Sequence, residues 1–298
     1  MRIRLFSNFA SSTELVRWVQ RQTPTRILRS NKIILVDDDT YTNAVVLNWT
    51  KEKILTPSNA NIALVMEPVE IRKICDRETL KPERYQSVDR IYSPSQDDKT
   101  IFGSKHRFFP SQILLFANIC QDSEPFPSIK RRRMSIVCSF KRLVPLQVKR
   151  VAVIEKLLST SLQIDFYGRD FRKSRDPRIK GNLPLVEKHK ALRPYQFSIA
   201  LENTMCPEVL TEKFQDCIVN HTVPITNNPG AKKYFPNDSC VLIDFNLSLD
   251  EIVNQIKQIY FHQQAKLYDI GLMQAKRQIL YGNFSFAQNM LRALNSQI

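Results

Sequence analysis

The sequence has no apolar run long enough to cross a membrane. Its 298 residues are 43% hydrophobic, but no stretch approaches the roughly 20 consecutive apolar residues that a spanning helix needs. The N-terminal segment MRIRLFSNFASSTELVRWVQ also lacks the apolar block of a signal peptide. We therefore expect a soluble, cytoplasmic protein with no membrane span.

Metal-ligand spacing is also missing. The six cysteines are scattered without a CxxC pair, and the four histidines have no Cys, Asp or Glu at ligand spacing. The acidic run Asp37–Asp39 invites a metal-binding interpretation, but a solvated turn after the strand-like KIILV (32–36) accounts for it better. The sequence therefore predicts free thiols and no metal site.

The formal charge of +15 is concentrated in one part of the chain. Residues 130–193 contain 18 Lys and Arg against 5 Asp and Glu, so they carry a net charge of +13. A nucleic-acid surface would need aromatic side chains interleaved with these charges for base stacking, and here the few aromatics fall mostly inside strand-like runs. A compact anionic ligand such as a diphosphate fits this charge at least as well.

Short apolar runs alternate with helical patterns along the whole chain, which is typical of α/β units with parallel sheets. The predicted strands of the first half are IRLF (3–6), KIILV (32–36), AVVLN (44–48), IALVM (62–66) and RIYS (90–93). Their short length and β-branched content favour strands that are buried on both faces. The stretch 93–109 reads as polar and irregular.

A second set of elements follows a Pro-rich and charged break near residues 125–133. The predicted elements are strands at 134–140, 162–168, 196–203, 223–225 and 240–245, helices at 148–158 and 211–220, and a helical tail over 248–298. No internal repeat or low-complexity linker interrupts this order. We predict two domains, an N-terminal one over 1–130 and a C-terminal one over 131–298 that includes the tail.

The stretch ALENTMCPEVLTEKF (200–214) places polar residues where ligands bind in open α/β sheets, beyond the carboxyl end of a strand. Glu202 and Asn203 end the strand, and Thr211 can cap the helix that begins with Glu212 and Lys213. A helix N-terminus stabilises a phosphate, Lys213 adds a charge, and Glu212 could accept hydrogen bonds from a ribose diol. A simple capped helix start remains the alternative for this pattern.

The segment ENTMCPEVLTEKFQDCIVNHTVPI (202–225) resembles the donor-binding signature of the alpha-1,3/1,4-fucosyltransferase family. Further similar segments are SFKRLVPLQVKRVAVIEKL (139–157), FYGR (166–169) and GAKKYFPNDSCVLIDF (230–245). The resemblance covers roughly residues 134–246. In the first half it is limited to IALVMEPVE (62–70), which resembles the loop that carries the proposed general base of the family.

This resemblance implies an α/β fold of the GT-B type, in which two Rossmann-like domains face a cleft. It also implies an inverting transferase that moves L-fucose from GDP-fucose to a glycan hydroxyl without a metal or other cofactor. Its partners would be the nucleotide sugar and a glycan, with no nucleic acid.

Residue by residue, the resemblance assigns the donor diphosphate to Arg150 and Lys213, with Arg169 also on the donor side. It assigns the ribose to Glu212, contacts with the sugar and loop to Glu202 and Asn203, and the base to Glu67. Glu70, three residues later, is the alternative base.

The sequence departs from the family pattern at several positions. Val209 stands where the family has Tyr, Leu201 where it has Phe, and Phe140 where it has Asn. Arg142 or Lys149 could replace Arg150, because Arg150 follows a few extra residues. These departures keep GDP-mannose or another nucleotide sugar open as the donor, and a basic polyanion-binding protein on the same scaffold is the alternative from another class.

Overall fold

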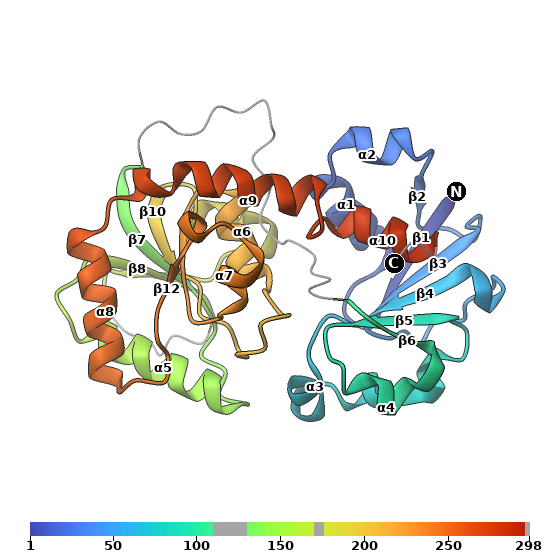
Figure 1. The fold of residues 1–298 in the computed structure, drawn as a ribbon, viewed down its shortest axis with the longest axis horizontal. Coiled ribbons are helices and arrows are strands. Elements are labelled where there is room, and N and C mark those ends of the chain that lie inside the picture. The colour runs from blue at the N-terminus through green and yellow to red at the C-terminus, as the bar shows by residue number, and fades with distance from the viewer. Residues whose placement is uncertain (110–129, 170–175, 296–298) are drawn as a thin grey trace. The chain divides into compact units, whose positions relative to one another are not determined.

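The computed structural model describes residues 1–109, 130–169 and 176–295. They form two compact units, Met1–Leu114 together with Gln278–Ile298, and Leu115–Arg277 (Figure 1). The predicted domain break lies mainly in residues 125–129, outside the described residues.

The first unit is built on a parallel sheet of six strands in the order β2-β1-β3-β4-β5-β6. Its strands are β1 (Arg2–Ser7), β2 (Ile34–Val36), β3 (Asn43–Leu47), β4 (Asn61–Leu64), β5 (Arg90–Ser93) and β6 (His106–Phe108). Its helices are α1 (Ser12–Gln22), α2 (Thr25–Ser30), α3 (Val69–Cys75), α4 (Asp98–Phe102) and α10 (Phe286–Leu294). The predicted cap of α1 is present, since the Ser11 side chain accepts from Glu14 N–H and Glu14 reaches back to Ser11.

Both faces of this sheet are buried, as the apolar runs predict. Side chains alternate between the faces along each strand, so Leu5, Val45 and Leu47 enter one core cluster and Phe6, Ala44 and Val46 enter another. The first cluster is completed by α1, α2 and α10, and the second by residues such as Tyr85, Val88 and Phe102.

The helical tail differs from its predicted assignment to the second domain. Helix α9 (Asp269–Tyr281) contains the boundary between the units, and α10 packs against α2 and β4 of the first unit. Phe286, Met290 and Leu291 are buried in the same cluster as β1 and β3. The apolar face of α10 therefore completes the core of the first unit, and Figure 1 shows α10 beside that sheet.

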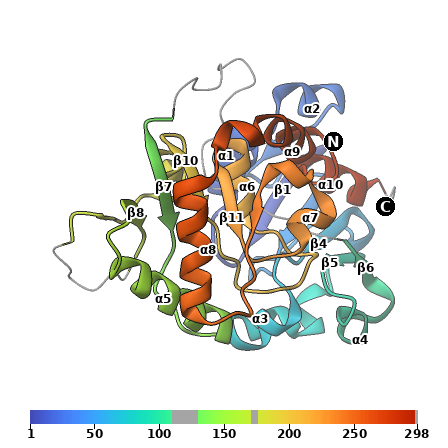
Figure 2. The same cartoon turned by 60° about the vertical axis from the view of Figure 1, so that its left-hand side comes forward.

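The second unit contains a second six-stranded parallel sheet, in the order β12-β11-β10-β7-β8-β9. Its strands are β7 (Arg132–Val137), β8 (Ile164–Tyr167), β9 (Ile179–Gly181), β10 (Tyr195–Ile199), β11 (Val223–Thr226) and β12 (Val241–Leu242). Its helices are α5 (Pro145–Leu158), α6 (Glu212–Val219), α7 (Gly230–Tyr234), α8 (Leu249–His262) and the 3-10 helix η5 (Leu185–Ala191). Helices α5 and α8 pack against each other (Figure 2), while α6 packs against β11.

The α/β class and the two parallel sheets are confirmed. Strands β6 and β9 were not predicted, and the prediction of an irregular 93–109 stretch was wrong because α4 and β6 lie there. Both missed strands have three residues and lie at the edge of a sheet. An edge strand needs little apolar surface, so His106–Phe108 and Ile179–Gly181 carry no hydrophobic signal.

Candidate functional site

The polar residues of the second unit gather at one edge of its sheet. All its strands are parallel, so their carboxyl ends lie at the same edge. Arg169 follows β8, Glu202 and Asn203 follow β10, and Asn227 and Asn228 follow β11. The start of α6 is bonded to this edge through Glu202.

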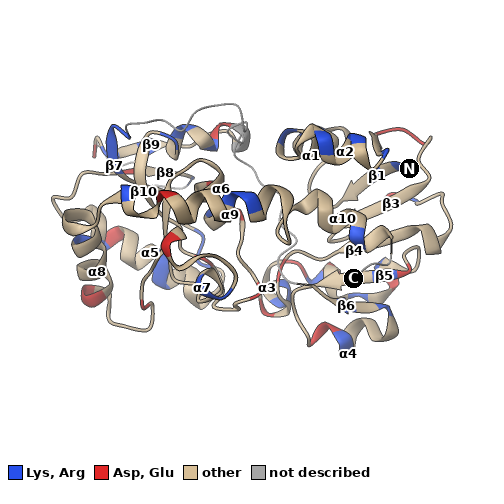
Figure 3. Ribbon diagram, turned by 45° about the horizontal axis from the view of Figure 1, so that its top comes forward, with Lys and Arg blue, Asp and Glu red and all other residues tan. Residues whose placement is uncertain are grey.

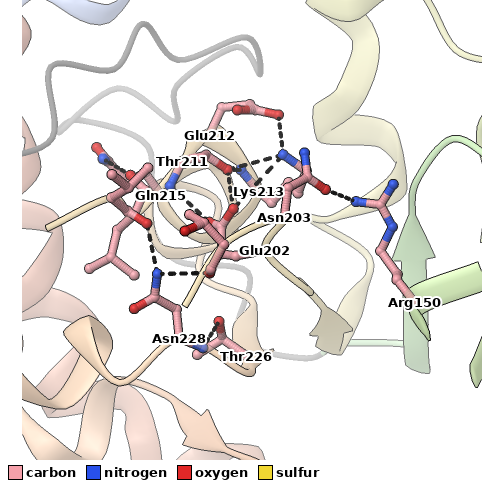
Figure 4. Close-up of polar contacts among 12 residues, drawn as sticks. Arg150, Glu202, Asn203, Thr211, Glu212, Lys213, Gln215, Thr226 and Asn228 are labelled. Atoms are coloured by element: carbon pink, nitrogen blue, oxygen red, sulfur yellow. Dashed lines mark hydrogen bonds and ion pairs between the residues drawn. The ribbon is translucent and has the colours of Figure 1, made fainter. Parts of the chain in front are cut away.

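The spacing between Glu202 and Thr211 is explained by direct contact (Figure 4). The Glu202 carboxylate accepts from the Thr211 N–H at 2.8 Å and from the Thr211 hydroxyl at 2.6 Å. Both residues are buried, with 0% and 3% exposure. Thr211 is the N-cap of α6, as predicted, because its hydroxyl accepts from the Lys213 N–H at 3.3 Å. Glu202 thus anchors the start of α6 to the end of β10.

Lys213 lies between three oxygen-bearing side chains. Its Nζ is 3.1 Å from the Thr211 hydroxyl, 3.2 Å from Glu212 and 3.9 Å from Glu202. Burial raises the pKa of Glu202. Burial also acts to raise the pKa of Glu212, but the charges of Lys213 and Lys188 outweigh it and hold that pKa at about 2. The pair of Glu212 and Lys213 therefore places opposite charges at the first turn of α6.

Arg150 reaches the same edge from α5. Its Nη1 donates to Asn203 Oδ1 at 2.5 Å and its Nη2 to the Ser139 carbonyl at 3.2 Å. The residue is 2% exposed, and its Nε has no hydrogen-bond partner among the described residues. Burial lowers the pKa of Arg150. A buried guanidinium with a spare N–H is suited to binding an anion, because an unmade hydrogen bond to a buried donor is costly.

The two basic alternatives to Arg150 have other partners. Arg142 forms an ion pair with Glu155, and Lys149 donates to the Leu247 carbonyl. Of these three basic residues, Arg150 is the one that contacts Asn203.

Gly168 fixes the backbone immediately before Arg169. Its φ is +144°, and a Cβ at this position would lie 1.5 Å from the Cys138 carbonyl oxygen. Only glycine permits both this conformation and this close approach. Arg169 itself is exposed, and its carbonyl accepts from the Phe140 N–H at 3.4 Å. Arg169 therefore stands at the sheet edge beside the segment that follows β7.

Two asparagines that the sequence analysis did not single out hold the loop between β10 and α6. Asn227 Oδ1 accepts from the Glu202 N–H at 2.7 Å. Asn228 Nδ2 donates to the carbonyls of Cys206 at 2.9 Å and Val209 at 2.8 Å. Their position directly after the strand VPIT could have identified them, because residues that follow a strand lie at the edge where ligands bind. Val209, which replaces the Tyr of the family pattern, is fully buried in this loop.

Glu67, the predicted base, follows β4 in the first unit. It is half-buried, and its carbonyl accepts from Arg72 Nε at 2.9 Å. Glu70 is exposed in the first turn of α3. The two candidates therefore differ in setting: Glu67 precedes the helix within a hydrogen-bonded segment, whereas Glu70 lies on its outer face.

The basic segments of the second unit use many of their charges internally. Arg133 donates to the carbonyls of Ile259 and Tyr260 near the end of α8, and Arg132 pairs with Asp165. Both lie at the start of β7, so they are at the sheet edge opposite the carboxyl ends. Figure 3 shows Lys and Arg spread over β7, α5, α7 and α9.

The acidic run of the first unit forms a turn with several partners. Asp37 accepts from the Thr13 hydroxyl, Asp38 accepts from the Thr40 N–H, and Asp39 pairs with Arg4. Among the described residues, no group of three or more His, Cys, Asp or Glu could hold a metal ion. Cys138, Cys217 and Cys240 are free thiols. Within the same ranges no helix is long and apolar enough for a membrane span.

Comparisons with known proteins point to one family. Residues 129–269 match the family model described as glycosyltransferase family 10 (fucosyltransferase) C-term. The alpha-(1,3)-fucosyltransferase fut-5 of Caenorhabditis elegans is 32% identical over 123 residues, which are 40% of this chain and 32% of that protein. Alpha-(1,3)-fucosyltransferase B of Drosophila melanogaster is 33% identical over 126 residues, 38% of this chain and 28% of that protein. The chain thus spans about a third or less of these relatives.

Solved structures match over almost the whole chain. A crystal structure of an alpha1,3-fucosyltransferase with GDP-fucose has a TM-score of 0.54 at 18% identity and covers 100% of this chain and 89% of that one. An alpha-glucosyltransferase in complex with UDP has a TM-score of 0.59 at 11% identity, covering 99% and 100%. These likenesses show the fold, which is of the GT-B type. The residues predicted to bind the donor, from Arg150 to Lys213, lie within the family match, whereas Glu67 lies outside it.

Proposed function

Because this chain belongs to the fucosyltransferases of glycosyltransferase family 10 through residues 129–269, we propose that it transfers L-fucose from GDP-fucose to a glycan hydroxyl, with inversion and without a metal. The observation that carries the proposal is the cluster of Arg150, Asn203, Glu212 and Lys213 at the carboxyl ends of β7 and β10. It joins a buried arginine, a lysine and a helix N-terminus at one sheet edge.

On the donor side, Arg150 and Lys213 bind the diphosphate and Arg169 adds a third positive charge. Hydrogen bonds between cations and phosphate are charge-assisted and strong. In the structure Lys213 is paired with Glu212. Donor binding would move the Lys213 ammonium toward phosphate and leave the Glu212 carboxylate to accept from the ribose diol. Glu202 and Asn203 keep these groups in place through Thr211 and Arg150.

In the transfer step, the acceptor oxygen forms a bond to the anomeric carbon of fucose while the bond from that carbon to the diphosphate oxygen breaks. The electron pair of the broken bond stays on GDP, and Glu67 takes the acceptor proton as general base. The cations stabilise the negative charge that develops on the leaving diphosphate. Removing one such contact typically costs about 3 kcal/mol in the transition state.

A thermal-unfolding panel tests the donor assignment. The ligands are GDP, GDP-fucose, GDP-mannose, a UDP-sugar and a short oligonucleotide, each at low and moderate salt. A ligand at 100 times its Kd adds about 2.7 kcal/mol of stability. We expect stabilisation by GDP and GDP-fucose that is lost in Lys213→Ala and kept in Lys266→Ala, which changes an exposed lysine of the same unit.

Other outcomes of this panel contradict the proposal. Equal or greater stabilisation by GDP-mannose or a UDP-sugar would change the donor. Stabilisation by the oligonucleotide alone, vanishing with salt, would favour a polyanion-binding protein.

A glycan array with labelled GDP-fucose tests the transfer itself. We expect Glu67→Gln to bind GDP-fucose as the native protein does and to transfer no fucose, and Glu70→Gln to remain active. Transfer that survives in Glu67→Gln but is lost in Glu70→Gln would move the base to Glu70.

A further inference from the structure

The backbone is held on both sides of the Glu67 Cα. Before it, the Met66 N–H donates to Asn48 Oδ1 at 3.0 Å. After it, the Glu67 carbonyl accepts from Arg72 Nε at 2.9 Å. Two side chains thus hold the Val65–Met66 peptide, one peptide removed from Glu67, and the Glu67–Pro68 peptide directly after it.

Asn48 is in a conformation that suits this contact. It follows β3 with a φ of +60°, in the left-handed region where asparagine is tolerated better than most residues. Its own N–H donates to the Leu64 carbonyl at 2.9 Å at the end of β4. The neighbouring strand end therefore carries both the backbone bond to Leu64 and the side-chain bond to Met66.

Arg72 is held as firmly from the other side. It is 1% exposed and forms an ion pair with the fully buried Asp98 of α4, while its Nη1 donates to the Thr79 carbonyl at 3.4 Å. A buried ion pair is stable only when its geometry and hydrogen bonds are good. The guanidinium that contacts Glu67 is therefore also bonded to Asp98 and to the Thr79 carbonyl.

We propose that Asn48 and Arg72 are positioning residues for Glu67. They hold the backbone shortly before and directly after Glu67, which limits how far its carboxylate can be displaced from the place where it takes a proton. This inference rests on the proposed role of Glu67 as base. It further requires that the Glu67 carboxylate be placed accurately, since displacement of a reacting group by about 1 Å can lower the rate about 100-fold.

The test compares Asn48→Gly with Asn48→Asp. Glycine keeps the positive φ and removes only the acceptor for Met66, whereas aspartate restores an acceptor in the same place. We expect Asn48→Gly to lower kcat for fucose transfer by about 10- to 100-fold with an unchanged Kd for GDP-fucose, and Asn48→Asp to recover most of the loss.

Val88→Ala is the matched stability control. Val88 is 1% exposed in the core of the same unit and is not in the segment around Glu67. If this variant lowers Tm as much as Asn48→Gly, its kcat should still remain native. A kcat loss in Asn48→Gly no larger than that of Val88→Ala at equal Tm would overturn the proposal, because the asparagine would then be merely structural.

The remaining outcomes distinguish failure of the positioning role from failure of the proposed fucosyltransferase activity. Absence of transfer by the native chain refutes the proposed function and this inference together. Full activity of Glu67→Gln refutes the base role, and positioning with it. Inactive Glu67→Gln together with native kcat in Asn48→Gly refutes the positioning role alone.

Discussion

Replacing Thr211 by valine or serine measures how strongly the start of α6 is held. Valine keeps the shape of threonine but removes the hydroxyl, which caps α6 and donates to Glu202. Loss of the cap costs about 1 kcal/mol. A hydrogen bond to a charged group is worth about 1.5–3 kcal/mol, and the buried Glu202 oxygen finds no substitute partner in valine. We therefore expect Thr211→Val to lower the free energy of unfolding by about 2.5–4 kcal/mol.

Serine provides the control, because it keeps the hydroxyl and loses one buried methyl group. That change costs about 1 kcal/mol. For a unit of this size, 1 kcal/mol corresponds to about 2–4 °C in Tm, so valine should lower Tm by roughly 10 °C and serine by roughly 3 °C.

The assay should follow far-UV circular dichroism during thermal and urea unfolding. Both tryptophans, Trp18 and Trp49, lie in the first unit, so their fluorescence would not report on α6. Equal stability of the valine and serine variants would refute the reasoning, since it would mean that the bonds between Glu202 and Thr211 contribute nothing net.

Three further predictions concern stability. Gly168→Ala should lower the free energy of unfolding by about 3 kcal/mol or more, because the positive φ is strained for alanine and the new Cβ meets the Cys138 carbonyl. A soluble variant with native Tm would contradict this prediction. The pKa of Glu212 is held at about 2 against an ordinary 4.5, so its stabilising contribution is present above pH 4.5 and is lost as the pH falls toward 2. Urea unfolding across this window should show the loss in the native protein and a smaller loss in Glu212→Gln. Arg72→Leu should lower the free energy of unfolding by about 3–5 kcal/mol, because it leaves Asp98 buried and unpaired. The double variant with Asp98→Leu should recover most of this loss. No recovery would contradict the prediction, because it would show that the ion pair itself stabilises the unit.

Local pattern was sufficient for most of the fold. The runs around β1, β3, β5 and β7 predicted strands close to their observed bounds, because the central residues of a strand that is covered on both faces are mostly apolar. The cap of α6 at Thr211 was readable for the same kind of reason, since an N-cap is a contact within a few residues. The edge strands β6 and β9 were missed because each has only three residues of mixed polar and apolar character, whereas the edge strands β2 and β12 lie in apolar runs and were predicted.

The sequence by itself determined two α/β units, the helix start at Thr211 and the residue types of the proposed diphosphate site. Only the tertiary structure decided which arginine of the 139–157 segment meets Asn203, that Asn228 holds the loop before α6, and that α10 packs in the first unit. Each of these depends on contacts between residues far apart in the chain. Such contacts are set by how strands order in a sheet and how apolar faces pack, and local sequence pattern carries no record of either.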